Sequence, residues 1–293
     1  MPKISDLASR VLVPLSGLLL FLQATLIVTG GAVRLTGSGL GCPTWPECTP
    51  GSYVPVAGQA EGAFHAWVEF GNRLLTFVLF FAAIAAIIYA FRKARKDLLW
   101  RAALQLLGIL GQGVLGGITV LTDLNPLAVA SHFILSIFLI AGAASMVERA
   151  RTPLVSIRPT EIKLRVLVTA QVALTFIVIV LGTLVTGSGP HAGDAQAPRL
   201  DIDSRAISWL HADAVIALLG VSLALFVLSD LSPVTKKRIK YFFAATLAQA
   251  LIGYVQYVQG LPELLVILHL LGSTLVWITT WRIWLSITTA ERT

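Results

Sequence analysis

Eight long apolar stretches, each close to twenty residues, divide the chain. They cover residues 11–33, 66–90, 100–121, 127–147, 163–185, 206–229, 239–258 and 263–287. An α-helix needs about 20 apolar residues to cross a hydrocarbon core of about 30 Å. The pattern therefore predicts eight membrane-spanning helices. The first stretch is too long for the apolar core of a cleavable signal peptide, so we expect it to remain as a span.

Matching residues recur along the chain and indicate a duplication. The segment GGAVRLTGSGLGCPTWPEC at residues 30–48 has a shortened copy, GTLVTGSGP, at residues 182–190, and we expect the same glycine turn after each span. Three further pairs are offset by 137 residues, namely Gln112 with Gln249, Gly116 with Gly253, and His132 with His269. We predict an all-α integral membrane protein whose eight transmembrane helices form two tandem, parallel four-helix bundles, residues 1–150 and 151–293, related by pseudo-two-fold symmetry.

Composition and charge agree with this class. Hydrophobic residues make up 56% of the chain and charged residues 13%, whereas a soluble domain carries roughly 25% charged residues. The net charge is +7, and its lysines and arginines gather near the termini and in alternate connections, within 92–101, 149–165 and 236–240. Positive residues mark the cytoplasmic side of a membrane. This placement predicts cytoplasmic termini and outer glycine-rich loops, and we expect no nucleic-acid partner.

The first outer loop holds both cysteines of the protein, Cys42 and Cys48. An oxidising exterior favours a disulfide between them, whereas a structural zinc site needs more ligands. The loop runs from about residue 35 to 64, and loops of this length are usually functional. We interpret it as a lid over an outward-facing site.

A polar cluster opens the second span. Four polar residues share one helical face, because the last three follow the first by four, seven and eight residues. They are His65, Glu69, Asn72 and Arg73. A simple ion pair between Glu69 and Arg73 at a helix end is one interpretation. Ionisable residues inside the apolar zone are costly and usually face a functional interior, so the functional interpretation is the stronger one.

Three histidines lie at one depth in the even-numbered spans. His132, His211 and His269 each lie about 6–9 Å inside the start of their span, at 1.5 Å per residue. Helical bundles hold iron porphyrins on imidazoles from facing helices, and His211 with His269 meet that need in the second half. In the first half the repeat places Asn72 opposite His132. Either His65, two turns away on the same face, replaces it, or His132 is the single strong ligand. We interpret the loop residue His191 as solvated.

Together these features resemble the bacterial haem A synthases. The resemblance rests on GGAVRLTGSGLGCPTWPEC, on EFGNR in the second span and on the histidines of spans four, six and eight. It implies oxidation of the C8 methyl group of haem O to a formyl group by successive hydroxylations, which supplies haem A to terminal oxidases. It also implies a haem b cofactor on His211 and His269, and haem O bound beside His132, with His65 as the candidate second ligand.

Further roles follow from the resemblance. Glu69 matches the family's glutamate and would accept protons or stabilise positive charge, and Arg34 and Arg73 would bind haem propionates. Many members carry a histidine where this chain has Asn72. The resemblance implies a multi-pass protein of the bacterial cell membrane, with haem sites toward the outer face. Candidate partners are haem O, the lipid bilayer, haem O synthase and terminal oxidase assembly factors, and a homo-oligomer is an open alternative.

Two other classes of protein compete with an enzyme. A di-haem b electron-transfer protein would need two symmetrical histidine pairs, and Asn72 counts against this symmetry. A transporter would show broken helices and inverted halves, whereas four spans separate the two copies here and make them parallel.

Overall fold

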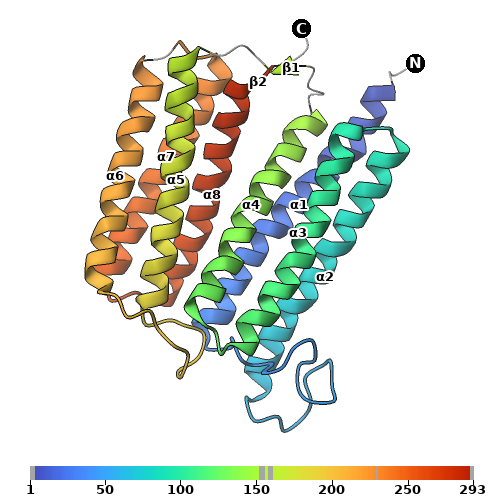
Figure 1. Ribbon diagram of the computed structural model, residues 1–293, viewed down its shortest axis with the longest axis vertical. Coiled ribbons are helices and arrows are strands. Elements are labelled where there is room, and N and C mark those ends of the chain that lie inside the picture. The colour runs from blue at the N-terminus through green and yellow to red at the C-terminus, as the bar shows by residue number, and fades with distance from the viewer. Residues whose placement is uncertain (1–3, 152–155, 158–160, 229, 291–293) are drawn as a thin grey trace.

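The structure is a computed structural model that describes residues 4–151, 156–157, 161–228 and 230–290. Its described part contains eight long helices and one short strand pair (Figure 1). The helices are α1 (Ile4–Leu35), α2 (Ala63–Arg92), α3 (Lys96–Leu121), α4 (Pro126–Arg151), α5 (Ile162–Ser188), α6 (Ser204–Leu228), α7 (Pro233–Val258) and α8 (Glu263–Thr288). Strands β1 (Ser156–Ile157) and β2 (Thr289–Ala290) pair antiparallel beside the end of α8. The all-α class and the eight helices are confirmed.

Seven of the eight described helices are long and apolar enough to cross a membrane, and α7 falls outside this set. Helix α7 is as long as its neighbours, but basic residues within 236–240 open it and two glutamines, Gln249 and Gln256, interrupt its apolar part. It packs along α8, and Gln249 donates a hydrogen bond of 2.6 Å to the carbonyl of His269. A polar side chain that turns toward a neighbouring helix lowers mean hydropathy without facing lipid.

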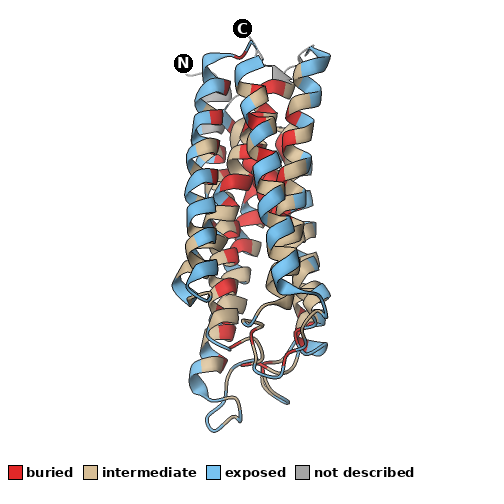
Figure 2. Cartoon of the chain, turned by 90° about the vertical axis from the view of Figure 1, so that its left-hand side faces the viewer, coloured by how far each residue is buried: buried red, intermediate tan, exposed pale blue. Residues whose placement is uncertain are grey.

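Helices α1–α4 pack around one apolar core and α5–α8 around another (Figure 1). Leu19, Leu79 and Leu98 are fully or almost fully buried in the first core, and Phe242 and Ile283 are fully buried in the second. Figure 2 shows buried positions along the inner faces of the helices and exposed positions along the outer faces. Each group of four therefore has its own interior.

A third apolar cluster joins the two groups. Ile27 of α1, Ile137 of α4, Ile179 of α5 and Trp277 of α8 meet there. The indole Nε1 of Trp277 donates a hydrogen bond of 2.7 Å to the carbonyl of Ile137. Because a buried indole N–H needs a partner, this bond fixes α8 against α4 across the boundary.

The two bundles differ in how they close. In the first bundle α2 packs closely along α3, so the four helices form a continuous ring. In the second bundle α5 pairs tightly with α6 and α7 with α8, while α6 packs much less closely against α7. The second bundle is therefore two helix pairs held together mainly through α5 and α8.

The two glycine segments do not form the same turn, which corrects one expectation from the sequence. Helix α1 ends at Leu35, and Gly37 then turns the chain with a φ of +66°. Helix α5 instead continues through Gly187 to Ser188. The amide of Leu200 donates a 2.9 Å hydrogen bond to the carbonyl of Gly187, so a loop satisfies the helix end and no turn is required.

Candidate functional site

Three half-buried histidines lie about two turns inside their helices, at the end of the molecule that carries the long loops (Figure 1). They are His132 on α4, His211 on α6 and His269 on α8. Each ring packs edge-on against a glycine of the preceding helix. The pairs are His132 with Gly116, His211 with Gly182 and His269 with Gly253. Parallel contacts on three helix pairs match the predicted common depth.

These glycines leave room for the rings and nothing larger. A β-carbon built on Gly116, Gly182 or Gly253 would lie 3.4, 3.3 or 2.9 Å, respectively, from the Cε1 atom of its histidine. Helical interiors are close-packed, so an added methyl group at the shortest distance would displace the ring. The glycines therefore position the imidazoles. The repeat had singled out two of them, Gly116 and Gly253, without assigning this contact.

His211 and His269 face one another across the second bundle. Their ring centroids are 6.5 Å apart and their planes are inclined by 60°. A metal ion between two imidazole nitrogens, with bonds of about 2 Å each, needs ring centroids about 6 Å apart. The Nδ1 atoms of both rings are buried and have no hydrogen-bond partner among the described residues. His211 and His269 would fit as the two imidazoles that hold an iron porphyrin.

The first bundle has an asparagine at the corresponding place. Asn72 of α2 lies against Gly30 of α1, with its Nδ2 atom 4.0 Å from a β-carbon built on that glycine, as His211 lies against Gly182. The hydroxyl of Thr29 donates a 2.7 Å hydrogen bond to Oδ1 of Asn72. The structure therefore brings Asn72 to the fourth position of a set in which the other three members are histidines.

Two glutamines make equivalent hydrogen bonds to the backbone carbonyls of His132 and His269. Gln112 donates a 3.1 Å hydrogen bond to the carbonyl of His132, and Gln249 donates one of 2.6 Å to the carbonyl of His269. Gln112 also donates to the hydroxyl of Ser136 at 2.6 Å. The 137-residue register seen in the sequence is therefore matched by equivalent contacts in the structure.

His65 lies at the start of α2, beneath the first loop. Its Nδ1 is 2.9 Å from the hydroxyl oxygen of Ser38, which is 2.8 Å from that of Thr36. The chain passes so close that a β-carbon on Gly41 would overlap the backbone of His65. His65 thus anchors the loop onto α2, and its role as an iron ligand stays a prediction.

Glu69 and Arg73 of α2 form hydrogen bonds to the first loop. The Oε1 atom of Glu69 accepts hydrogen bonds of 2.6 and 3.1 Å from Arg73, and its Oε2 accepts one of 2.7 Å from the amide of Cys42. Arg73 also donates to the carbonyls of Cys42, Thr44 and Glu47 at 2.9, 3.2 and 3.2 Å. Glu69 is 6% exposed. A carboxylate this enclosed has a fixed position, and Arg73 is largely committed to holding it.

The predicted disulfide is present between Cys42 and Cys48, both fully buried. Inside its ring, Trp45 lies against Gly117 of α3, where a β-carbon would be 2.6 Å from the indole. The small loop thereby spans from α2 to α3 over the mouth of the first bundle, a contact that the sequence did not predict. Figure 2 shows buried residues within this loop region.

Arg34 connects the two halves. Its Nη2 donates a 2.6 Å hydrogen bond to the carbonyl of Thr186 at the end of α5, while its buried Nε has no partner among the described residues. The amide of Gly39 donates to the carbonyl of Gly193 at 2.9 Å. His191, expected to be solvated, is half-buried, and its Nε2 lies 2.9 Å from the carbonyl of Leu261. The propionate roles of Arg34 and Arg73 stay predictions.

The metal-binding side chains of this site are imidazoles that do not cluster within the described residues. Across the described ranges, no three histidine, cysteine, aspartate or glutamate side chains gather in a way that could hold an ion. Imidazoles instead occur singly or as one facing pair. The fold and this arrangement define a multi-pass helical membrane protein with half-buried imidazoles near one end of its helices.

Comparison with known proteins identifies the family. Residues 15–281 match the COX15-CtaA family, described as cytochrome oxidase assembly protein, and the chain belongs to it. A protein named "Heme A synthase" from Azorhizobium caulinodans is 29% identical over 308 residues, covering 86% of each chain.

Two relatives from Geobacillus carry the same name and match over shorter segments. The protein of Geobacillus kaustophilus is 36% identical over 110 residues, and that of Geobacillus thermodenitrificans 33% over 108 residues. Each match covers 36% of this chain and 32% of the relative. The matched segment therefore spans about a third of the length of each of these two relatives.

Proposed function

We propose that this protein is a haem A synthase, a membrane oxidoreductase that oxidises the C8 methyl group of haem O to a formyl group by successive hydroxylations. Family membership and the relatives' names support the activity. The observation that carries the proposal is the unequal set of four matched positions: His211 faces His269 in one bundle, whereas the other has His132 against Gly116 and Asn72 against Gly30. A permanent electron carrier and a reacting porphyrin need different surroundings, and the difference between the two bundles supports this assignment.

In the second half, residues 151–293, His211 and His269 would hold haem b as the resident cofactor. The geometry of the pair supports this role. When bound, haem b supplies one-electron transfer, which the conversion requires because a methyl carbon loses four electrons on becoming a formyl carbon. The glycines at 182 and 253 keep both rings at the depth where they face each other.

In the first half, residues 1–150, His132 would hold haem O from one side. His65 remains the alternative second ligand, since the Ser38 contact at Nδ1 leaves Nε2 available. It lies seven residues, or about 10 Å along α2, from Asn72, which is the position matched to His211. Asn72 is engaged with Thr29, and a carboxamide is a weak iron ligand. A single strong ligand is therefore the arrangement that the contacts favour.

Glu69 is the candidate for proton handling at the substrate. Its two oxygens are held by Arg73 and the amide of Cys42, so the carboxylate cannot swing away from the mouth of the first bundle. A positioned carboxylate accepts the protons released as the methyl group is oxidised, or stabilises positive charge that develops there. The disulfide loop, by supplying one of these contacts, acts as a positioning element for Glu69.

The orientation and partners belong to the same proposal. Basic residues gather at the end away from the loops, which supports cytoplasmic termini and haem sites toward the outer face of a bacterial cell membrane. Haem O would be the substrate, and haem O synthase and terminal oxidase assembly factors the neighbouring proteins. A di-haem electron-transfer protein remains the competing function, and it would leave both porphyrins chemically unchanged.

The test is expression in a host that makes haem O but no haem A, followed by acid extraction and chromatographic separation of the haems. The proposal predicts a formyl-bearing haem that the same host without the gene does not make. Recovery of haem B and haem O alone, from intact protein loaded with both, would contradict the enzymatic function and favour electron transfer.

A further inference from the structure

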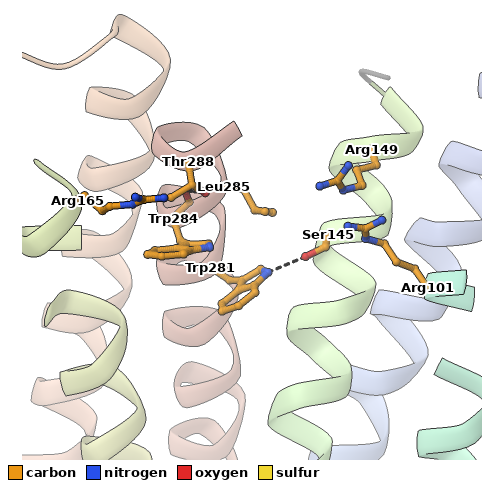
Figure 3. A pocket seen from close by; sticks show the side chains of 8 residues that line it. All are labelled: Arg101, Ser145, Arg149, Arg165, Trp281, Trp284, Leu285 and Thr288. Atoms are coloured by element: carbon orange, nitrogen blue, oxygen red, sulfur yellow. Dashed lines mark hydrogen bonds between the residues drawn. The ribbon is translucent and has the colours of Figure 1, made fainter. Parts of the chain in front are cut away.

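A cavity of about 320 Å³ opens between the two bundles, at the end of the molecule away from the disulfide loop (Figure 3). Arg101 of α3 and Arg149 of α4 line it from the first bundle, and Arg165 of α5 lines it from the second. Trp281 and Trp284 of α8 form its wall. Among the described residues that line it, none carries a carboxylate.

The positive charge of this cavity is not balanced from within. Arg101 and Arg149 lie close enough to repel each other, and the Nε of Arg149 is buried without a hydrogen-bond partner in the part of the chain that the structure describes. Outside the cavity, Asp97 binds Arg95 at 2.8 Å and lies close enough to Arg101 and Arg149 to offset part of their charge. Glu148 of α4 accepts from Arg238 of α7 and Arg282 of α8. A group of guanidinium donors that share a cavity without a carboxylate favours an anionic ligand.

The aromatic wall is fixed in place. The indole Nε1 of Trp281 donates a 2.7 Å hydrogen bond to the hydroxyl of Ser145, which itself donates to the carbonyl of Ala141 at 2.8 Å. The rings of Trp281 and Trp284 stack at 6.4 Å between centroids and 29° between planes. With the indole N–H of Trp281 satisfied internally, its ring offers the cavity an apolar face beside the arginines.

We propose that this cavity binds the phosphate headgroup of an anionic phospholipid between the two halves of the protein. The guanidinium plane matches phosphate oxygens in pairs, and basic pockets between membrane helices are suited to anionic headgroups. Indole rings concentrate at the same depth as headgroups, so Trp281 and Trp284 lie beside the glycerol and the first acyl carbons. Such a lipid bridges α3 and α4 to α5 and α8, independently of the haem chemistry.

The test is native mass spectrometry of the full-length protein released from nanodiscs of equal phosphatidylcholine and phosphatidylglycerol. One phosphatidylglycerol should be retained about tenfold over phosphatidylcholine. The double variant Arg149→Gln/Arg165→Gln should lose this preference. Lys236→Gln/Lys240→Gln is the matched control, because it removes the same charge from exposed positions on α7, and it should retain the preference. Equal retention of both lipids by the wild type, or equal loss in the control, would overturn the proposal.

Two further arms distinguish a bound lipid from a soluble anion and from a misfolded variant. Inorganic phosphate at 10 mM should leave the retained lipid in place, and its displacement would assign the cavity to a soluble anion instead. The variant Arg149→Lys/Arg165→Lys keeps the positive charge, and it tests the proposal even if the glutamine variant does not fold. It should lower retention about threefold because lysine lacks the paired donors, and unchanged retention would contradict recognition by the guanidinium groups.

Discussion

The two bundles share a design and differ at one matched position and one loop. Both place glycine against the side chain of the facing helix at a common depth, and three of these four side chains are histidines. The second bundle completes a facing imidazole pair, whereas the first has Asn72 and, above it, a disulfide loop that grips Glu69. The comparison teaches that matched glycine contacts can carry different side chains, and it is the basis for the proposal that the first bundle holds the substrate and the second the cofactor.

The largest effect is expected from removing an imidazole of the second bundle. His269→Ala leaves His211 without its facing partner, so bound haem b should fall below detection, measured as pyridine haemochrome per protein. His191→Ala is the control, because that ring contacts the carbonyl of Leu261 outside the pair, and it should keep wild-type haem content. Full haem content in His269→Ala would remove this residue from the cofactor site.

Next comes Glu69, the buried carboxylate of the first bundle. Glu69→Ala should retain both haems and lower conversion of haem O about 100-fold, in the range of a lost general acid or base. Haem A formed per bound haem is the measurement, and Glu61→Gln in the same loop region is the control. Undiminished product would exclude Glu69 from the mechanism.

A change that makes the first bundle resemble the second sharpens the comparison further. Asn72→His would place a fourth imidazole beside Gly30. Gly30 contacts residue 72 as Gly182 contacts His211. The substrate haem should shift toward a low-spin absorption spectrum, and conversion should fall about tenfold because the iron is then held from both sides. His65→Ala tests the alternative ligand. If it alone changed the substrate-haem spectrum, His65 would replace the single-ligand interpretation.

The smallest effect is expected from the glycines that seat the rings. Gly253→Ala places a β-carbon 2.9 Å from His269 and should lower haem b content about threefold, while Gly182→Ala, at 3.3 Å from His211, should have a smaller effect. Gly220→Ala on α6 meets nothing within 4 Å and serves as control. Equal haem content in all three variants would show that the rings do not depend on these contacts.

The sequence predicted the fold because its signals were long and repeated. Apolar stretches fixed the helices, and the 137-residue offset correctly related His132 to His269 through Gln112 and Gln249. The sequence did not predict the conformation near Gly187. The same glycine-rich segment can continue a helix or form a turn, depending on which distant group donates hydrogen bonds to its carbonyls. Leu200 does so in the second half.

The candidate site was only partly predictable for a related reason. Residues of one helix face, such as Glu69 and Arg73, are grouped by local periodicity. Local periodicity does not predict contacts between distant segments. Examples are the hydrogen bond from the Cys42 amide to Glu69 and the packing of Trp45 against Gly117. Both depend on the path of a long loop, for which the sequence offers no periodic signal.

Electron paramagnetic resonance of the wild-type protein, loaded with haem b and haem O, tests the central comparison most directly. Unequal bundles predict one low-spin haem with two imidazole ligands and one high-spin haem, in equal amounts. The low-spin signal should disappear in His269→Ala and the high-spin signal should remain. Two low-spin haems with paired imidazoles in the wild type would contradict the account, because the first bundle would then hold its porphyrin as the second does.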